Sequence, residues 1–376
     1  MISRLGRHCM ELSYETYILI VRHVATRSEL ASLCSVSKPF RRAAERLLYN
    51  TLSLKGPDTS IELSRVLSTT PRLAFLVEAL SIYASGNGSD SEDSPVPLPE
   101  DYWTSIASAL AKLHRLRFLN VFIEGANDGS QAWVLAGCPF QLRTFHCDFE
   151  WDEHLSDFLD TQLQLSDLYI ADFKPPSPES PPQSLDPRPL PRLATLECTY
   201  MEAASALVPG RPVTRLKTCF SASQVDEKRA EMRTLFSNIR RSRRHLRSLD
   251  IADASYTQDF SLELLTMAVN TFSSSNHLRY LGTLVLPVGG RERLAFYGTL
   301  MRLSRLQCVE VEVTDWDPTP TTPAALRALT FELRIYCPSV SRVVYVCDFD
   351  RVVMKVTNSR CFLDEEVNTD TLWREV

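Results

Sequence analysis

The chain has 376 residues, 44% of them hydrophobic and 23% charged, which is the composition of a globular protein with room for one large or two unequal folded units. A net charge of −5 gives no general attraction to nucleic acid or to an anionic membrane surface, so neither is expected as a partner. No signal region and no apolar run near the roughly 18 residues of a membrane span is found, and ten scattered cysteines favour reduced thiols. We therefore expect a protein of the cytoplasm, the nucleus or both.

Residues 12–54 contain three short stretches of helical periodicity. Their apolar positions are, in turn, Tyr17, Ile20, Val21 and Val24; Leu30, Leu33 and Cys34; and Phe40, Ala43, Ala44 and Leu47. The run from Tyr17 to Val21 is apolar throughout, so the first helix is apolar on all sides, and a unit this small cannot cover it. Another surface must do so.

Two motifs in this segment resemble an F-box. Leu12-Ser13-Tyr14-Glu15 matches the opening Leu-Pro-x-Glu with Ser in place of Pro, and residues 36–40 match the closing Val-Ser-Lys-x-Phe. Ser13 is a competent N-cap, so the helix can still begin there. The run from Arg41 to Leu54 is similar to the passage of fungal F-box proteins into a first strand. The alternative interpretation is a small helical cap on the repeats that follow.

From residue 77 onward one pattern recurs: an apolar residue, two others, a second apolar residue, one other, and a third apolar residue or Cys. The middle residues are Leu80, Leu119, Phe145, Leu168, Leu196, Leu249, Leu284, Val309 and Val343, with a degenerate copy around Leu216 and Cys219. Their spacing resembles the 20–29 residue period of leucine-rich repeats with insertions. The usual asparagine of such repeats is missing. The predicted fold is α/β: three helices, then an irregular leucine-rich-repeat-like strand and helix solenoid with a parallel sheet.

The repeats place helices and insertions between the strands. Residues 101–113 and 223–241 are predicted helices. Residues 85–101, which are acidic, and 174–192, which are rich in proline, are predicted insertions in a solenoid of residues 55–346. Residues 347–376 are expected to form a C-terminal cap or tail.

Candidate chemical sites are weak. Residues that can bind a metal are most concentrated at Cys138, His146, Cys147, Glu150, Asp152 and His154, but their spacing fits no known metal motif. Cys147 and Cys198 also fall at repeat positions that are expected to be buried. The basic cluster Arg240, Arg241, Arg243, Arg244 and Arg247 is best explained by cations at a helix C-terminus, and the Pro-x-x-Pro matches at Pro175–Pro181 by a linker. No hydrolase, nucleotide or metalloprotease motif occurs.

The resemblance implies an adaptor function. An F-box docks on the Skp-type subunit of a cullin–RING ubiquitin ligase, and the solenoid then holds the protein to be ubiquitinated, so the chain would need no cofactor and would not be an enzyme. The residues expected at the adaptor face match the family pattern or exceed what the small core can hide: Leu12, Ser13, Tyr17, Ile20, Val21, Leu30, Val36 and Lys38. A ligase-independent repeat scaffold and a hidden hydrolase remain as alternatives.

Residues beside the middle repeat position should point away from the core, into the concave face of the solenoid. This set is Asn120, His146, Asp148, Asp167, Tyr169, Glu197, Thr199, Asp250, Glu310 and Glu312. Most of these residues are acidic, so the expected protein substrate carries a basic segment with Lys or Arg.

Overall fold

The computed structural model describes residues 12–84, 98–123, 131–171, 190–253, 255, 257–348 and 350–376. It divides into two compact units, residues 1–144 and 145–376, which are treated separately below. Most of the two predicted insertions, including Pro175–Pro181, lies outside the described residues.

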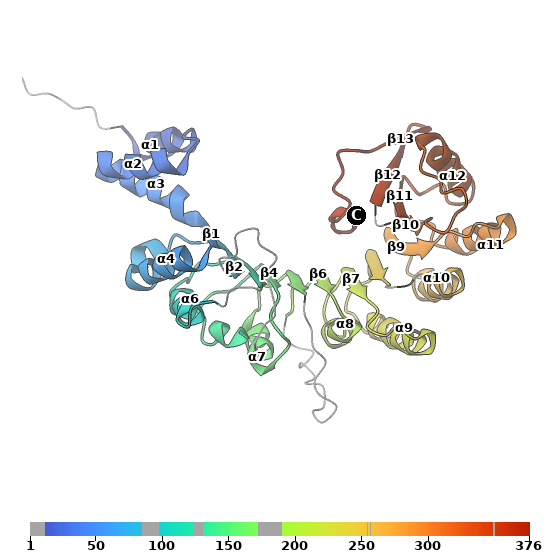
Figure 1. Ribbon diagram of the computed structural model, residues 1–376, viewed down its shortest axis with the longest axis horizontal. Helices are drawn as coiled ribbons and strands as arrows, with labels where there is room; N and C mark the ends of the chain where they lie inside the picture. Colours follow the sequence, from blue (N-terminus) through green and yellow to red (C-terminus); the bar gives the residue numbers. More distant parts are fainter. Residues whose placement is uncertain are drawn as a thin grey trace, which may run out of the picture. The chain divides into compact units, whose positions relative to one another are not determined.

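Unit 1 begins with three helices and continues with alternating strands and helices (Figure 1). Its elements are α1 (Tyr14–Arg22), α2 (Arg27–Val36), α3 (Lys38–Asn50), β1 (Thr51–Lys55), α4 (Pro57–Thr69), α5 (Pro71–Ala74), β2 (Ala79–Ala84), α6 (Tyr102–Leu110), β3 (Phe118–Ile123) and the 3-10 helix η1 (Ala132–Leu135). Strands β1, β2 and β3 pair in parallel and in chain order. Residues 51–55 are therefore part of the sheet.

Each of the first three helices begins at a hydroxyl side chain that caps it. Ser13, Thr26 and Ser37 accept hydrogen bonds from the backbone N–H three residues later, which satisfies donors that the helix itself cannot pair. Thus the Ser in place of the F-box proline preserves the start of α1.

The third helix connects the helical segment to the strands of unit 1. Glu45 of α3 is buried and forms a bidentate ion pair with Arg72 of α5, in which Nη2 lies 3.1 Å from Oε1. The chain runs from α3 directly into β1, where Leu52 and Leu54 are buried. Helix α3 is thus the helix of this segment that packs on the repeats.

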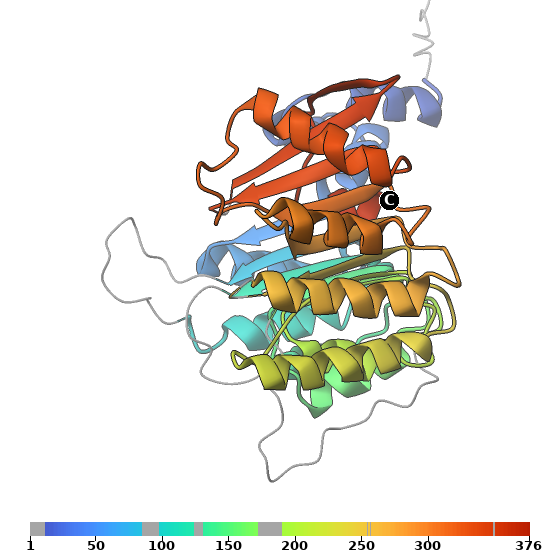
Figure 2. The same ribbon diagram turned by 90° about the vertical axis from the view of Figure 1, so that its right-hand side faces the viewer.

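Unit 2 repeats the strand and helix arrangement (Figures 1 and 2). Its elements are β4 (Thr144–Cys147), α7 (Glu153–Thr161), β5 (Asp167–Ile170), β6 (Thr195–Cys198), α8 (Met201–Leu207), β7 (Arg215–Cys219), α9 (Val225–Arg240), β8 (Ser248–Ala252), α10 (Gln258–Phe272), β9 (Tyr280–Val285), α11 (Gly290–Leu300), β10 (Cys308–Glu312), α12 (Pro323–Tyr336), β11 (Arg342–Cys347), β12 (Asp350–Thr357), β13 (Arg360–Leu363) and α13 (Leu372–Glu375).

The strands of unit 2 follow chain order and mostly run in parallel. Strands β5 to β11 pair in parallel, each with the next, whereas β12 and β13 are antiparallel additions to the end of the sheet. Helices α9 to α12 lie side by side on one face of the sheet, and the C-terminal α13 lies on the other, the concave face (Figures 1 and 2). The predicted α/β solenoid with a parallel sheet is confirmed.

The nine predicted middle residues are all buried, as a repeat core requires. The structure corrects the register of two repeats. Leu216 pairs with Leu196 and Leu249, so it holds the middle position of β7, and Cys219 does not.

In β9 the middle residue is Leu281, not the predicted Leu284. Leu281 pairs with Leu249 on one side and Val309 on the other, and a bulge then brings Leu284 opposite Val311. The extra residue leaves both leucines buried, so the apolar pattern of the sequence could not distinguish them.

The bulge brings Gly282 into a crowded position. A Cβ atom there would lie 3.0 Å from Asp250 Oδ1 and 3.1 Å from the Cβ of Glu310, whereas one on Gly298 of α11 would have nothing within 4 Å. We therefore expect Gly282→Ala to destabilise the protein by about 1–3 kcal/mol. Gly298→Ala, the matched control, should stabilise it by about 0.5–1 kcal/mol through helix propensity. Urea denaturation of both variants tests this, and equal effects would contradict it.

Candidate functional site

The first candidate site is the outer surface of the N-terminal helices. Leu12, Ile20 and Val36, all predicted adaptor contacts, are 48%, 38% and 64% exposed. Leu19, which the sequence analysis did not single out, is exposed as well. Large apolar side chains left partly exposed on α1, on α2 and just before α1 make this a candidate surface for a partner.

Two predicted contact residues lie in the core instead, which corrects their assignment. Val21 and Leu30 are 0% and 8% exposed and pack with Ala43 and Ala44 of α3. A three-helix segment needs a core of its own. Val21 and Leu30 belong to the apolar faces of their helices, and these faces turn toward the neighbouring helices. They support the surface only indirectly.

Two of the remaining predicted contacts, Tyr17 and Lys38, border a shallow hollow. It encloses about 240 Å³ and is lined by Leu12, Tyr14, Tyr17, Lys38, Pro39 and Arg42. The half-buried Tyr17 ring meets Phe40 edge-on at 4.7 Å, and the Arg42 guanidinium lies 5.9 Å from the Tyr14 ring centroid. The two F-box-like motifs, at opposite ends of residues 12–40, thus meet at one hollow.

Two identical substitutions separate core from surface. Leu30→Ala should lower the free energy of unfolding by about 2–4 kcal/mol, because it leaves a cavity among α1, α2 and α3. Leu12→Ala removes the same atoms from an exposed position and should change it by less than about 0.5 kcal/mol. Chemical denaturation measures both. A large loss for Leu12→Ala would show that it belongs to the core.

The second candidate site is the concave face of unit 2. Strand register places Tyr169, Glu197, Lys217, Asp250 and Gly282 in one row across β5 to β9. These residues alternate with the buried leucines, so they lie on the face away from the helices. The row brings predicted acidic residues together, and Lys217, which was not predicted, lies 3.3 Å from Glu197.

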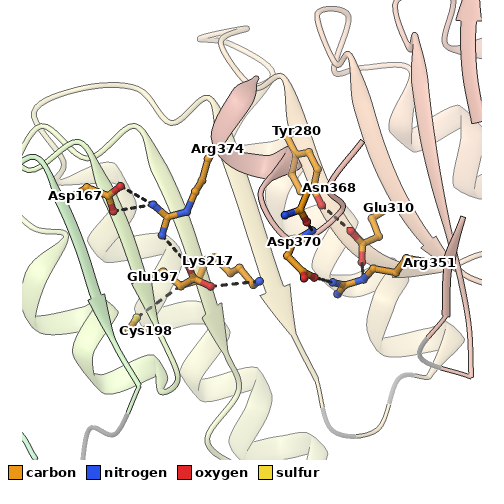
Figure 3. Close-up of polar contacts among 10 residues, drawn as sticks. All are labelled: Asp167, Glu197, Cys198, Lys217, Tyr280, Glu310, Arg351, Asn368, Asp370 and Arg374. Carbon is orange, nitrogen blue, oxygen red and sulfur yellow. Dashed lines mark hydrogen bonds and ion pairs between the residues drawn. The ribbon is translucent and has the colours of Figure 1, made fainter. Parts of the chain in front are cut away.

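The C-terminal helix α13 inserts an arginine between Asp167 of β5 and Glu197 of β6, two of the predicted acids (Figure 3). Arg374 Nη1 donates to both oxygens of Asp167 at 2.7 and 2.6 Å, and its Nη2 donates to Glu197 Oε2 at 2.6 Å. Burial by itself raises the pKa of Asp167, but His146 and Arg374 hold it below the usual value. The Asp167–Glu197 pair thus holds a guanidinium group.

A second cation reaches Glu310, further along the concave face (Figure 3). Arg351 of β12 lies 3.2 Å from Glu310 Oε1 and 3.1 Å from Asp370 Oδ1. Tyr280 donates to Glu310 Oε2 at 2.6 Å. Burial and the nearby carboxylates raise the pKa of Tyr280 well above its usual value, so it stays a donor. Glu310 is therefore part of a fixed internal network.

Asp250 is the acid with the most perturbed ionisation. It is 4% exposed, and only Gly282 separates its carboxylate from that of Glu310. Burial and the Glu310 charge raise the pKa of Asp250 to about 7. Asp250 and Glu310 are 4% and 1% exposed, so in this structure neither of these two predicted contacts presents an exposed carboxylate.

The raised pKa of Asp250 predicts a pH dependence of stability. The unfolded pKa is about 3.9, so the stabilisation from protonated Asp250 is present at acidic pH and lost as pH rises through about 7. Between pH 6 and 8 this group should lower the free energy of unfolding by about 1.4 kcal/mol.

Asp250→Asn removes the ionisable group and should remove that part of the pH dependence. Urea denaturation at pH 6, 7 and 8 measures it, with Asp315→Asn, an exposed aspartate, as control. Parallel pH profiles for the wild type and Asp250→Asn would contradict the assignment.

The other predicted concave residues are more dispersed. His146 Nε2 lies 3.7 Å from Asp167 Oδ1, Thr199 is exposed, and Glu312 accepts from the backbone N–H of Thr314 at 3.1 Å. Asp148 is half-buried in unit 2, and Asn120 is buried on β3 of unit 1. The sequence analysis missed Lys217, Tyr280, Arg351 and Arg374. A basic residue beside a middle leucine could have indicated Lys217, but no local pattern indicates Arg374.

The structure supplies no metal-binding group of three or more His, Cys, Asp or Glu residues within the part of the chain it describes. Burial raises the pKa values of Cys138 and Cys147 to about 12, and Cys147 and Cys198 lie in the core as predicted. Arg240 lies in the last turn of α9. Among the described helices, none has the length and apolar character to cross a membrane.

These features define a class of protein: a leucine-rich-repeat-like solenoid of parallel strands and helices with three helices at its N-terminal end. No family model and no curated protein matches the chain. Among solved structures it is similar to a chain of the crystal structure of the Rad7 and Elc1 complex in yeast, with 14% identity over 88% of this chain and 87% of that chain, and a TM-score of 0.36.

Proposed function

We propose that this protein is a substrate-recognition adaptor of a Skp, cullin and RING ubiquitin ligase. The N-terminal helices α1 to α3 bind the Skp-type subunit, and the repeats bind a protein substrate. The observation that carries the proposal is the set of exposed apolar side chains in the F-box-like segment: Leu12, Ile20 and Val36.

The division of the three helices supports this role. Helix α3 connects to the repeats through the Glu45–Arg72 ion pair and the direct continuation into β1. Helix α1 leaves Leu19 and Ile20 exposed and borders the hollow with Tyr17. One side of the helical segment is thus occupied by the chain itself, and the other is available to a partner.

The chain performs no bond-making step in this proposal. An adaptor that holds a substrate close to a charged conjugating enzyme raises the effective concentration of the substrate lysines, which by itself accelerates transfer.

Co-purification with a Skp-type adaptor tests the proposal. The intact chain should retain the adaptor, and Ile20→Asp with Val36→Asp should reduce retention at least tenfold, because a charge cannot be buried unpaired in the interface. Leu294→Asp is the control: Leu294 of α11, in unit 2, is 50% exposed, between Ile20 at 38% and Val36 at 64%. Circular dichroism checks that each variant is folded.

Point variants are preferable to removal of residues 1–54, because that deletion also removes most of β1, which pairs with β2. If the intact chain fails to retain the adaptor, the ligase assignment is wrong and a ligase-independent repeat scaffold becomes the better interpretation. If the double variant retains the adaptor as well as the wild type does, the binding surface lies elsewhere.

A further inference from the structure

The concave face of unit 2 contains a site built for an arginine side chain. Asp167 on β5 and Glu197 on β6 stand on neighbouring strands and accept three hydrogen bonds from a single guanidinium group, that of Arg374, at 2.6 to 2.7 Å. Such planar, forked recognition suits arginine, whereas the point charge of lysine cannot make the same set of bonds.

The group in this site belongs to the end of the chain. Arg374 lies 207 residues from Asp167 in sequence, and no residue of the segment between β13 and α13 is fully buried. The side chains of Arg374, Asp167 and Glu197 keep 20%, 27% and 21% of their surface exposed, so water and competing ions can reach all three.

The Glu310 network differs in this respect. Arg351 belongs to β12, a strand paired on both sides, and Glu310 itself is buried. An arginine on a sheet strand cannot leave without unfolding the edge of the sheet. Arg374, by contrast, lies on the four-residue helix α13, which is not part of the sheet.

The anchoring of α13 is imperfect. Leu372 and Trp373 are buried against Tyr280, Cys308 and Val344, which favours docking. The indole Nε1 of Trp373, however, is buried and has no hydrogen-bond partner in the described structure. Its desolvation opposes docking, so the helix is held less firmly than its buried surface alone implies.

We infer that Asp167 and Glu197 form a binding site for an arginine of a partner protein, and that the chain's own α13 fills this site until such a partner displaces it. The partner segment carries an arginine beside a large aromatic or aliphatic side chain, as Arg374 lies beside Trp373, with its guanidinium 4.6 Å from the indole ring centroid. The inference rests on the proposed function in that the partner is the substrate.

A peptide copy of the natural occupant provides the probe. Fluorescein-labelled Thr-Leu-Trp-Arg-Glu-Val, the sequence of residues 371–376, is titrated with the full chain. The Trp373→Ala, Arg374→Gln double variant should bind it at least tenfold more tightly than the wild type, because its own α13 no longer competes. Adding Asp167→Asn and Glu197→Gln should remove this gain.

Two controls separate arginine recognition from general attraction. A peptide with Lys in place of Arg should bind at least fivefold more weakly, because it loses the forked contact. Arg360→Gln, which removes an exposed arginine of β13, should leave the affinity at the wild-type value. A folded double variant that binds the probe no better than the wild type would overturn the inference.

The wild-type chain gives a test that needs no variant. The backbone N–H of Arg374 donates to the carbonyl of Thr371 at 2.8 Å, so its hydrogen exchange reports on α13. Excess probe should speed exchange at residues 372–376 at least threefold and leave β5 and β6 unchanged. Unchanged exchange would show that α13 is a permanent clamp. Adaptor co-purification is a separate readout, so failure of the ligase assignment would not be confused with failure of the arginine site.

Discussion

A short strand can bury only one of its faces beneath its own helix, and the rest of this structure follows from that constraint. Each repeat places a middle residue such as Leu168, Leu196 or Leu249 beneath the helices, where neighbouring copies cover it. The opposite face of the strands is then free to be polar. Strand pairing aligns the residues of this polar face in rows, so side chains from distant parts of the sequence meet across the sheet.

The rows bring carboxylates close to one another, and arginines of the C-terminal segment neutralise their charge. Carboxylates on neighbouring strands repel one another, and Asp250, which lies close to Glu310, responds by holding its proton more firmly. Where the acids are charged, Arg351 and Arg374 neutralise them from β12 and α13. The residues after β13 thereby cover part of the concave face of unit 2, whereas β12 and β13 extend the sheet.

The two proposed binding sites depend on different physics. The N-terminal helices present apolar side chains, Ile20 and Val36 among them, whose burial by a partner is driven by the hydrophobic effect. The concave face offers a carboxylate pair that recognises geometry as well as charge, and it is already filled. An adaptor with this arrangement would dock on its ligase constitutively and select its substrate by competition with its own C-terminal helix.

Local pattern determined the repeats, the cap at Ser13 and the α/β class, because helical and strand periodicity are properties of neighbouring residues. Tertiary packing decided which residues face the core and how the strands align, because neighbouring residues in the sequence do not show this. Whether Val21 faced a partner or the core depended on where α3 lay, and the bulge in β9 shifted the register to Leu281. Above all, the pairing of Arg374 with acids some two hundred residues away is visible only in three dimensions, because sequence separation carries no information about which charges the folded chain brings together.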